Sequence, residues 1–318
     1  MKRSLFVAAL ATLAAGSALA QSNVTIWGRL NETVERQKVA GVSSTVVNDN
    51  ASRLGFRGTE DLGGGLSANF LLEHRFGPDT GAAANPFWAG QSEVNLASKS
   101  LGAIRLGRFT SEAYFATADY VSMHNHDTGT SADALYYSAA GWDATNKIAY
   151  QSAEFVPGLV FHAAIGLREA TAAPNRRDFA VNYNLGALAL GAGYEAQGDN
   201  NQFALRALYA FGPFTVGGYY QRADDAVGGN RDNVRLAGMY TFGASEVHLN
   251  AGLANDWKNI AGDSGAKQFT VGYNYNLSKR TKVYTYFTKL AVDENAALPA
   301  NIQQADYQSV ALGIRHNF

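Results

Sequence analysis

The stretch SRLGFRGTEDLGGGLSANFLLEHRF, residues 52–76, alternates apolar residues with polar or small ones on both sides of a glycine cluster. Leu54 and Phe56 alternate with Arg53 and Arg57, and the same pattern resumes after the glycines. A period of two predicts β-strands with two unlike faces. The stretch alone leaves open which face meets water.

Strand-like segments of roughly 8–12 residues recur from Val24 to Phe318. Their connections fall into two kinds. Short turns are expected at 61–65, 98–102, 154–159, 184–187, 211–213, 242–244 and 276–280. Longer polar loops are expected near 37–50, 77–89, 109–145, 169–176, 197–201, 223–232, 255–265 and 292–304. Because the two kinds alternate along the chain, they predict sixteen strands.

Short connections at one edge and long ones at the other are typical of outer-membrane β-barrels. An even number of strands places both termini at the short-turn rim. A soluble β-sandwich is the alternative, but sandwiches rarely sort their connections so consistently. The predicted fold is therefore all-β, a transmembrane 16-stranded antiparallel β-barrel with lipid outside and water inside.

The N-terminal segment MKRSLFVAALATLAAGSALA has two basic residues, an apolar run and a final Ala-Leu-Ala. This pattern predicts a cleaved signal peptide at 1–20, followed by a single barrel domain at 21–318. A membrane anchor is the alternative, but the apolar run is too short to span about 30 Å of hydrocarbon.

Composition argues against a disulfide-stabilised protein and against a protein that binds nucleic acid. The chain has no cysteine, so no disulfide can staple it. Its formal net charge is −1, which argues against a partner that is a nucleic acid.

The apolar faces also assign side chains to the lumen. The basic residues that would point inward are Arg29, Arg53, Arg57, Arg75, Arg105, Lys147, Arg206, Arg235 and Arg315. The inward acids are fewer: Glu73, Glu93, Asp178 and Glu246. An arginine facing lipid at mid-depth would cost about 2–4 kcal/mol, so the set as a whole belongs in the lumen. Arg108 has the opposite parity to Arg105 and would reach the lumen only past a bulge or a strand end.

Four segments resemble the Gram-negative general (trimeric) porin family of betaproteobacterial type: residues 52–70, LGAIRLGRF at 101–109, VTIWGRL at 24–30 and the terminal Phe318. The resemblance implies a homotrimer of barrels whose third outer loop, about 109–145, folds inward and narrows the pore. It places Arg53 and Arg108 on family wall positions. The third basic position of the family reads Asp143 here, with Lys147 nearby, and the PEFG signature of the inward loop is missing.

The candidate constriction therefore combines wall arginines with loop carboxylates. The wall residues are Arg53, Arg57, Arg75 and Arg108, and the loop residues are Glu112, Asp119, Asp127 and Asp133. His124 and His126 could bind a metal, but no third ligand follows from the spacing, and a plain polar loop is favoured. No cofactor is expected.

The function expected is passive diffusion of ions and small hydrophilic solutes, with weak anion selectivity. An enzyme is the less favoured alternative, because none of the six histidines lies in a nucleophile motif. A substrate-specific channel is the stronger alternative, although no regular aromatic ladder lines the lumen faces. Expected partners are outer-membrane lipid and lipopolysaccharide, and the barrel-assembly machinery through Phe318. The last strand is expected to pair with Val24–Leu30.

Overall fold

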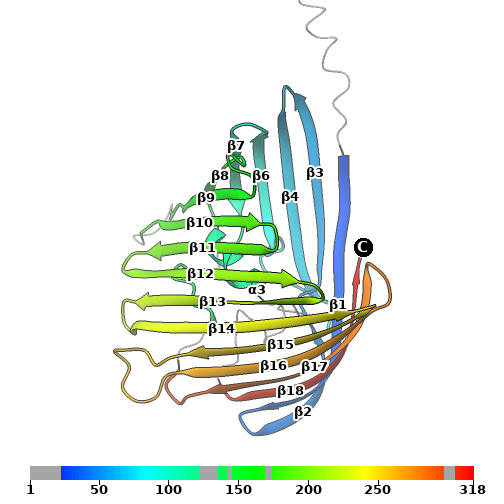
Figure 1. Ribbon diagram of the computed structural model, residues 1–318, viewed down its shortest axis with the longest axis vertical. Coiled ribbons are helices and arrows are strands. Elements are labelled where there is room, and N and C mark those ends of the chain that lie inside the picture. Colours follow the sequence, from blue (N-terminus) through cyan, green and yellow to red (C-terminus); the bar gives the residue numbers. More distant parts are fainter. Residues whose placement is uncertain (1–22, 122–134, 142–144, 169–173, 297–304) are drawn as a thin grey trace, which may run out of the picture.

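The computed structural model describes residues 23–121, 135–141, 145–168, 174–296 and 305–318 (Figure 1). The strands are β1 (Asn23–Val39), β2 (Val42–Asp49), β3 (Arg53–Gly63), β4 (Leu66–Gly77), β5 (Ala82–Ala83), β6 (Gln91–Ser98), β7 (Gly102–Arg108), β8 (Lys147–Gln151), β9 (Leu159–Gly166), β10 (Arg176–Leu185), β11 (Leu188–Gln197), β12 (Asn200–Phe211), β13 (Phe214–Asp225), β14 (Gly229–Phe242), β15 (Ser245–Ala254), β16 (Ala266–Asn276), β17 (Thr281–Val292) and β18 (Tyr307–Asn317). Two short helices follow β7: α2 (Glu112–Ala116) and α3 (Ala118–Val121).

These segments form one closed antiparallel barrel. The sheet contains 18 segments within the described residues, but β5 has only two residues, and β2 and β3 pair with successive parts of β1 as one broken strand. The barrel therefore has sixteen strands, and pairing of β1 with β18 closes it. The predicted fold class is confirmed.

The first and last strands meet with an offset that was not predicted. β18 pairs with Arg29–Val39, so only the end of the expected segment Val24–Leu30 meets the last strand, and the rest of the expected register is wrong. The first half of β1 pairs with β3 and extends past the C-terminus, which lies beside the middle of β1 in Figure 1. The tilt of strands in a closed barrel explains the offset, because tilt staggers each strand against its neighbour.

Several connections expected to be long loops are tight turns between extended strands. The segment 37–50 is mostly strand, since β1 ends at Val39 and β2 starts at Val42. Gly41 has φ 86°, a left-handed conformation that glycine adopts without steric cost and that closes the turn. The segments 197–201 and 223–232 are likewise short turns, because polar residues there continue the strands.

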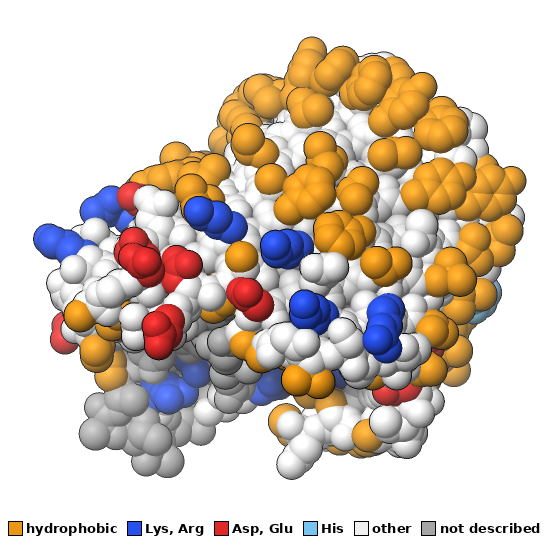
Figure 2. All heavy atoms as spheres, turned by 90° about the horizontal axis from the view of Figure 1, so that it is seen from below, with side chains coloured by type: hydrophobic (Ala, Val, Ile, Leu, Met, Phe, Trp, Pro, Cys, Tyr) orange, Lys and Arg blue, Asp and Glu red, His pale blue; other side chains and the backbone are white. Residues whose placement is uncertain are grey.

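Large hydrophobic side chains lie on the outer face of the barrel. Leu312 is 66% exposed and Val271 is 38% exposed, as their alternation predicts. Leu54 and Phe56 lie opposite His74 and Leu72 on this same face. In the view of Figure 2, hydrophobic side chains cover a broad area, and charged side chains gather on one side of it. The outer face is therefore the one suited to lipid.

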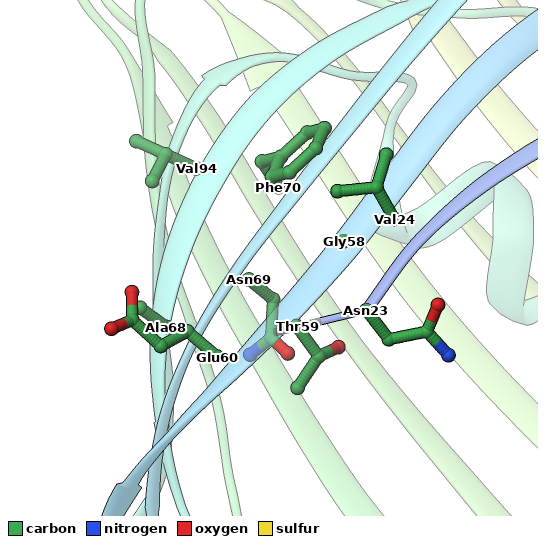
Figure 3. A pocket seen from close by; sticks show the side chains of 9 residues that line it. All are labelled: Asn23, Val24, Gly58, Thr59, Glu60, Ala68, Asn69, Phe70 and Val94. Carbon is green, nitrogen blue, oxygen red and sulfur yellow. The ribbon is translucent and has the colours of Figure 1, made fainter. Parts of the chain in front are cut away.

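Aromatic rings fill the space above two glycines of the 52–70 stretch. A Cβ on Gly55 would collide with the indole of Trp27 on the inner face, and a Cβ on Gly58 would collide with the ring of Phe70 on the outer face. Figure 3 shows Phe70 near Val24, around Gly58. The two glycines thus leave the space that rings from neighbouring strands occupy.

The helices α2 and α3 lie inside the barrel, against strands β9 to β14. No helix among the described residues is long and apolar enough to cross a membrane.

Candidate pore constriction

Three arginines occupy facing positions on neighbouring strands of the inner wall. Arg29 of β1 lies directly opposite Arg53 of β3, and Arg53 lies directly opposite Arg75 of β4. We call these three residues the arginine row. Arg29 donates from Nη2 to the carbonyl of Ala51 at 2.8 Å, and Arg53 donates from Nε to the same carbonyl at 3.2 Å.

The arginine row contacts one buried carboxylate on the same wall. Glu73 lies 3.7 Å from Arg53 and 3.0 Å from Arg75, and its side chain is 7% exposed. The side chain of Arg75 is 41% exposed and that of Arg53 is 17% exposed. The row therefore presents guanidinium groups to the lumen from a rigid sheet.

Arg57 lies on the same inner face as Arg53, four residues further along β3. Its side chain is exposed. It borders a hollow of the wall that Glu93 and Asn95 also line. The wall arginines of β3 and β4 thus lie together, as the alternation predicts.

The segment after β7 packs against the opposite wall. Asp178 of β10 caps helix α2: its carboxylate accepts bonds from the backbone N–H of Glu112 at 2.6 Å and of Ala113 at 2.9 Å. Gly191 and Gly193 of β11 leave room for the helix, because a Cβ on either would collide with Ala116 or Ala113. Close packing of this kind holds α2 within the lumen.

Beside α2 lies a cluster of charged groups. Arg105 pairs with Glu93 and with Glu112, each at 2.7 Å, and Glu112 lies 3.2 Å from His162. In the same cluster Lys147 pairs with Asp178 at 3.1 Å, and both side chains are buried.

The ring of Phe109 lies between the two cations of this cluster. The guanidinium of Arg105 stands 4.2 Å from the ring centroid, and the ammonium of Lys147 stands 4.6 Å from it. Such contacts are attractive because the ring faces carry partial negative charge. The first residues of the loop are thereby anchored to the wall.

The carboxyl of Glu112 is ionised at neutral pH. Burial raises its pKa, but the hydrogen bond with His162 and the charges of Arg105 and Lys147 outweigh burial and lower the pKa below its usual value of 4.5. Glu112 therefore holds the loop to the wall as a charged group rather than standing free in the lumen.

A second piece of the same loop contacts the lumen wall further along. Gln202 donates to the Tyr136 hydroxyl at 2.8 Å, and Ser138 donates to Glu195 at 2.9 Å. Leu135 is fully buried against β15 to β18. Asp119 lies in α3, which packs against β12 to β14 rather than against the strands that hold the arginine row.

Arg108 is placed apart from Arg105. It has the parity of Ile104 and Leu106, which are outward, and its Nε donates to the carbonyl of Ala89 at 3.1 Å. Arg108 is the last residue of β7. The structure does not bring Arg108 into the arginine row.

Other predicted residues are placed as follows. Asp127 and Asp133 lie outside the described residues, as do His124, His126, Asp143 and the proposed signal peptide. Arg206 and Arg235 are buried in the inner wall, where Arg235 donates to Asn250 and Gln268. Among the described residues, no group of three or more histidines and acids is arranged to hold a metal.

Sequence reasoning missed several lumen residues. Glu35 is 1% exposed and accepts bonds from Tyr286 at 2.7 Å and Tyr307 at 3.0 Å. Glu195 and Arg231 are also buried on the inner face. The alternation could have placed these residues on the inner face, because Glu35 follows the outward Val34 and Glu195 follows the outward Tyr194.

Comparison with known proteins agrees with this geometry. Residues 7–295 match the family model described as Gram-negative porin. The chain is 33% identical to outer membrane porin protein 32 of Delftia acidovorans, over 100% of both chains. It is 27% identical to an outer membrane porin protein of Bordetella pertussis, again over 100% of both.

A solved structure matches the whole barrel. The anion-selective porin from Comamonas acidovorans superposes with a TM-score of 0.78 at 28% identity, and the match covers 94% of this chain and 100% of that one. The protein therefore belongs to the Gram-negative porins of betaproteobacterial type and is a passive β-barrel channel of the outer membrane.

Proposed function

We propose that this channel passes ions and small hydrophilic solutes with a modest preference for anions, set by the arginine row. The observation that carries the proposal is the facing alignment of Arg29, Arg53 and Arg75 across three neighbouring strands. Their charges are fixed on a sheet, so they act at close quarters on any ion that passes.

The positions of the carboxylates that pair with basic residues support a preference for anions. Beside α2, Arg105 and Lys147 each lie within 3.1 Å of a carboxylate, which offsets their charges. The arginine row places three further positive charges on β1, β3 and β4. Because salt screens charges beyond about 8–10 Å, the preference should shrink as the salt concentration rises.

The reversal potential of single channels in a salt gradient tests the proposal. We expect the wild-type potential to lie on the anion side, and Arg53→Ala to move it toward cations while slightly raising conductance, since bulk is removed. The matched control is Arg222→Ala, which removes an arginine paired with Asp232 on the outer side of β13. This control should leave the potential unchanged.

Three outcomes contradict the proposal. A cation-selective wild-type channel would mean that loop carboxylates dominate the constriction. A low conductance that one solute blocks at micromolar levels would instead favour a substrate-specific channel. An unchanged potential in Arg53→Ala would make Arg53 ordinary lining of the lumen.

We also propose that the mature protein, residues 21–318, is a homotrimer embedded in lipid and lipopolysaccharide. The apolar outer face supports contact with lipid or with further copies. Light scattering of the detergent-solubilised protein should give three times the monomer mass. N-terminal sequencing of the purified protein should begin at Gln21, and a start at Met1 would contradict cleavage of the signal peptide.

A further inference from the structure

The second strand of the barrel contains one residue more than its partner requires. Arg29 lies opposite Arg53 and Glu32 lies opposite Asp49. Two residues of β1 therefore face the three residues 50–52. This is the arrangement of a β-bulge, which bends a strand and re-aims the groups beside it.

Ala51 is the central residue of this bulge. Its φ is 60°, in the left-handed region that residues other than glycine seldom adopt. In this conformation its carbonyl leaves the ladder and accepts bonds from two guanidinium groups, those of Arg29 and Arg53.

The bulge is held in place from several sides. The backbone N–H of Asn31 donates to the Ser52 hydroxyl at 3.0 Å, and the Asn31 side chain donates to the carbonyl of Asn50 at 2.8 Å. The Asn50 side chain donates to the Tyr284 hydroxyl at 3.1 Å. Asn31, Asn50 and Ser52 are all fully buried. A bulge so firmly bonded is a fixed feature of the wall.

We propose that the bulge at Ala51 is a positioning element, which aligns Arg29 and Arg53 side by side and thereby sets the anion preference of the pore. The inference rests on the proposed anion-preferring function. Two guanidinium groups at facing positions repel each other and would turn apart. A carbonyl oxygen between them carries partial negative charge, offsets the repulsion and fixes both orientations.

Deletion of Ala51 tests the proposal directly. Without the extra residue the ladder becomes regular: Asn50 then faces Asn31, and Arg53 still faces Arg29 from the inner side. Both charges remain in the lumen, but the shared carbonyl is lost. We expect the anion-to-cation permeability ratio to fall toward that of the Arg29→Gln/Arg53→Gln double variant. We expect Ala51→Gly, which adopts a positive φ readily, to keep the wild-type ratio.

A second variant keeps the test decisive if the deletion does not assemble. Arg53→Lys retains the charge but removes the Nε donor that binds Ala51. The ratio should fall in Arg53→Lys and remain unchanged in the control Arg222→Lys on the outer face. A wild-type ratio in Arg53→Lys would overturn the proposal, as would a wild-type ratio in an assembled deletion variant.

The double variant separates this inference from the proposed function. If Arg29→Gln/Arg53→Gln keeps the wild-type ratio, the arginines do not set selectivity and both ideas fail. If the double variant lowers the ratio but the deletion does not, only the positioning role fails. Combined with the double variant, the deletion should have no further effect on the ratio, because its effect acts through the two arginines.

Discussion

The ring of Phe318 lies over Gly28, where a Cβ would collide with it, and the backbone N–H of each residue donates to the carbonyl of the other at 3.0 Å. The last residue of the chain is thus bound to the middle of the first strand. The contact adds to closure of the barrel, because it extends the ladder between β1 and β18 as far as Gly28.

Gly28→Val should therefore weaken closure. The added side chain must displace the Phe318 ring, and such overpacking typically costs about 1–3 kcal/mol. Denaturant unfolding in detergent should show a lower midpoint. The matched control is Gly238→Ala, an outward strand glycine whose added Cβ would meet only one methyl at 3.9 Å. An equal loss of stability in both variants would contradict this role of Gly28.

Deletion of Phe318 should reduce assembly into the outer membrane but leave export across the inner membrane intact. The deletion removes the ring and the backbone bonds that join β18 to Gly28. We also expect the barrel-assembly machinery to recognise this residue. Fractionation of cells, with quantification in the outer membrane and the periplasm, measures both steps. Normal assembly of the truncated protein would refute the prediction.

Gly193→Val should displace helix α2 from the wall, since Ala113 occupies the space that the side chain needs. The helix would then move toward the centre of the lumen, and single-channel conductance should fall. Gly238→Ala is the control, because its added Cβ would meet only one methyl group, at 3.9 Å. Conductance at the wild-type level in Gly193→Val would show that α2 does not limit the pore.

Glu112 should make loop docking sensitive to acid. Its pKa in the folded protein is lowered from 4.5, so its contribution to stability is complete above that value and is lost as the pH falls through the lower folded pKa. We expect Glu112→Gln to reduce stability at pH 7 by about 1–3 kcal/mol, since Arg105 and His162 lose a charged partner. Unfolding measured from pH 7 downward should show a smaller acid-dependent loss in the variant. An identical pH profile would contradict this role.

The alternation of short and long connections predicted the number of strands, and the period-two pattern predicted the face of most side chains. Arg53, Arg57 and Arg75 lie on the inner wall because their neighbours Leu54, Phe56 and Leu72 are apolar, and that inference needs only local sequence. Strict alternation allows one step along the strand for each residue. The bulge at Ala51 adds a step that the alternation does not reveal, because the position lacks the glycine that usually marks a positive φ.

The position of the inner loop could not be predicted, for a different reason. Asp178 caps α2 from 66 residues away in sequence, and Gly191 and Gly193 make room for it. No local pattern links these residues. The stagger that pairs β18 with Arg29–Val39 is likewise a property of the closed barrel rather than of either strand.

The rings that pack on Gly55 and Gly58 also help to fix the register between neighbouring strands. A slip of one residue between β1 and β3 would turn every side chain to the wrong face. A slip of two residues would keep the faces correct, but Trp27 would then meet Arg53 or Arg57 instead of Gly55. Gly55 therefore disfavours a misalignment of β1 against β3 that hydrophobicity alone would tolerate, and Gly58, which receives Phe70 of β4, acts in the same way between β3 and β4.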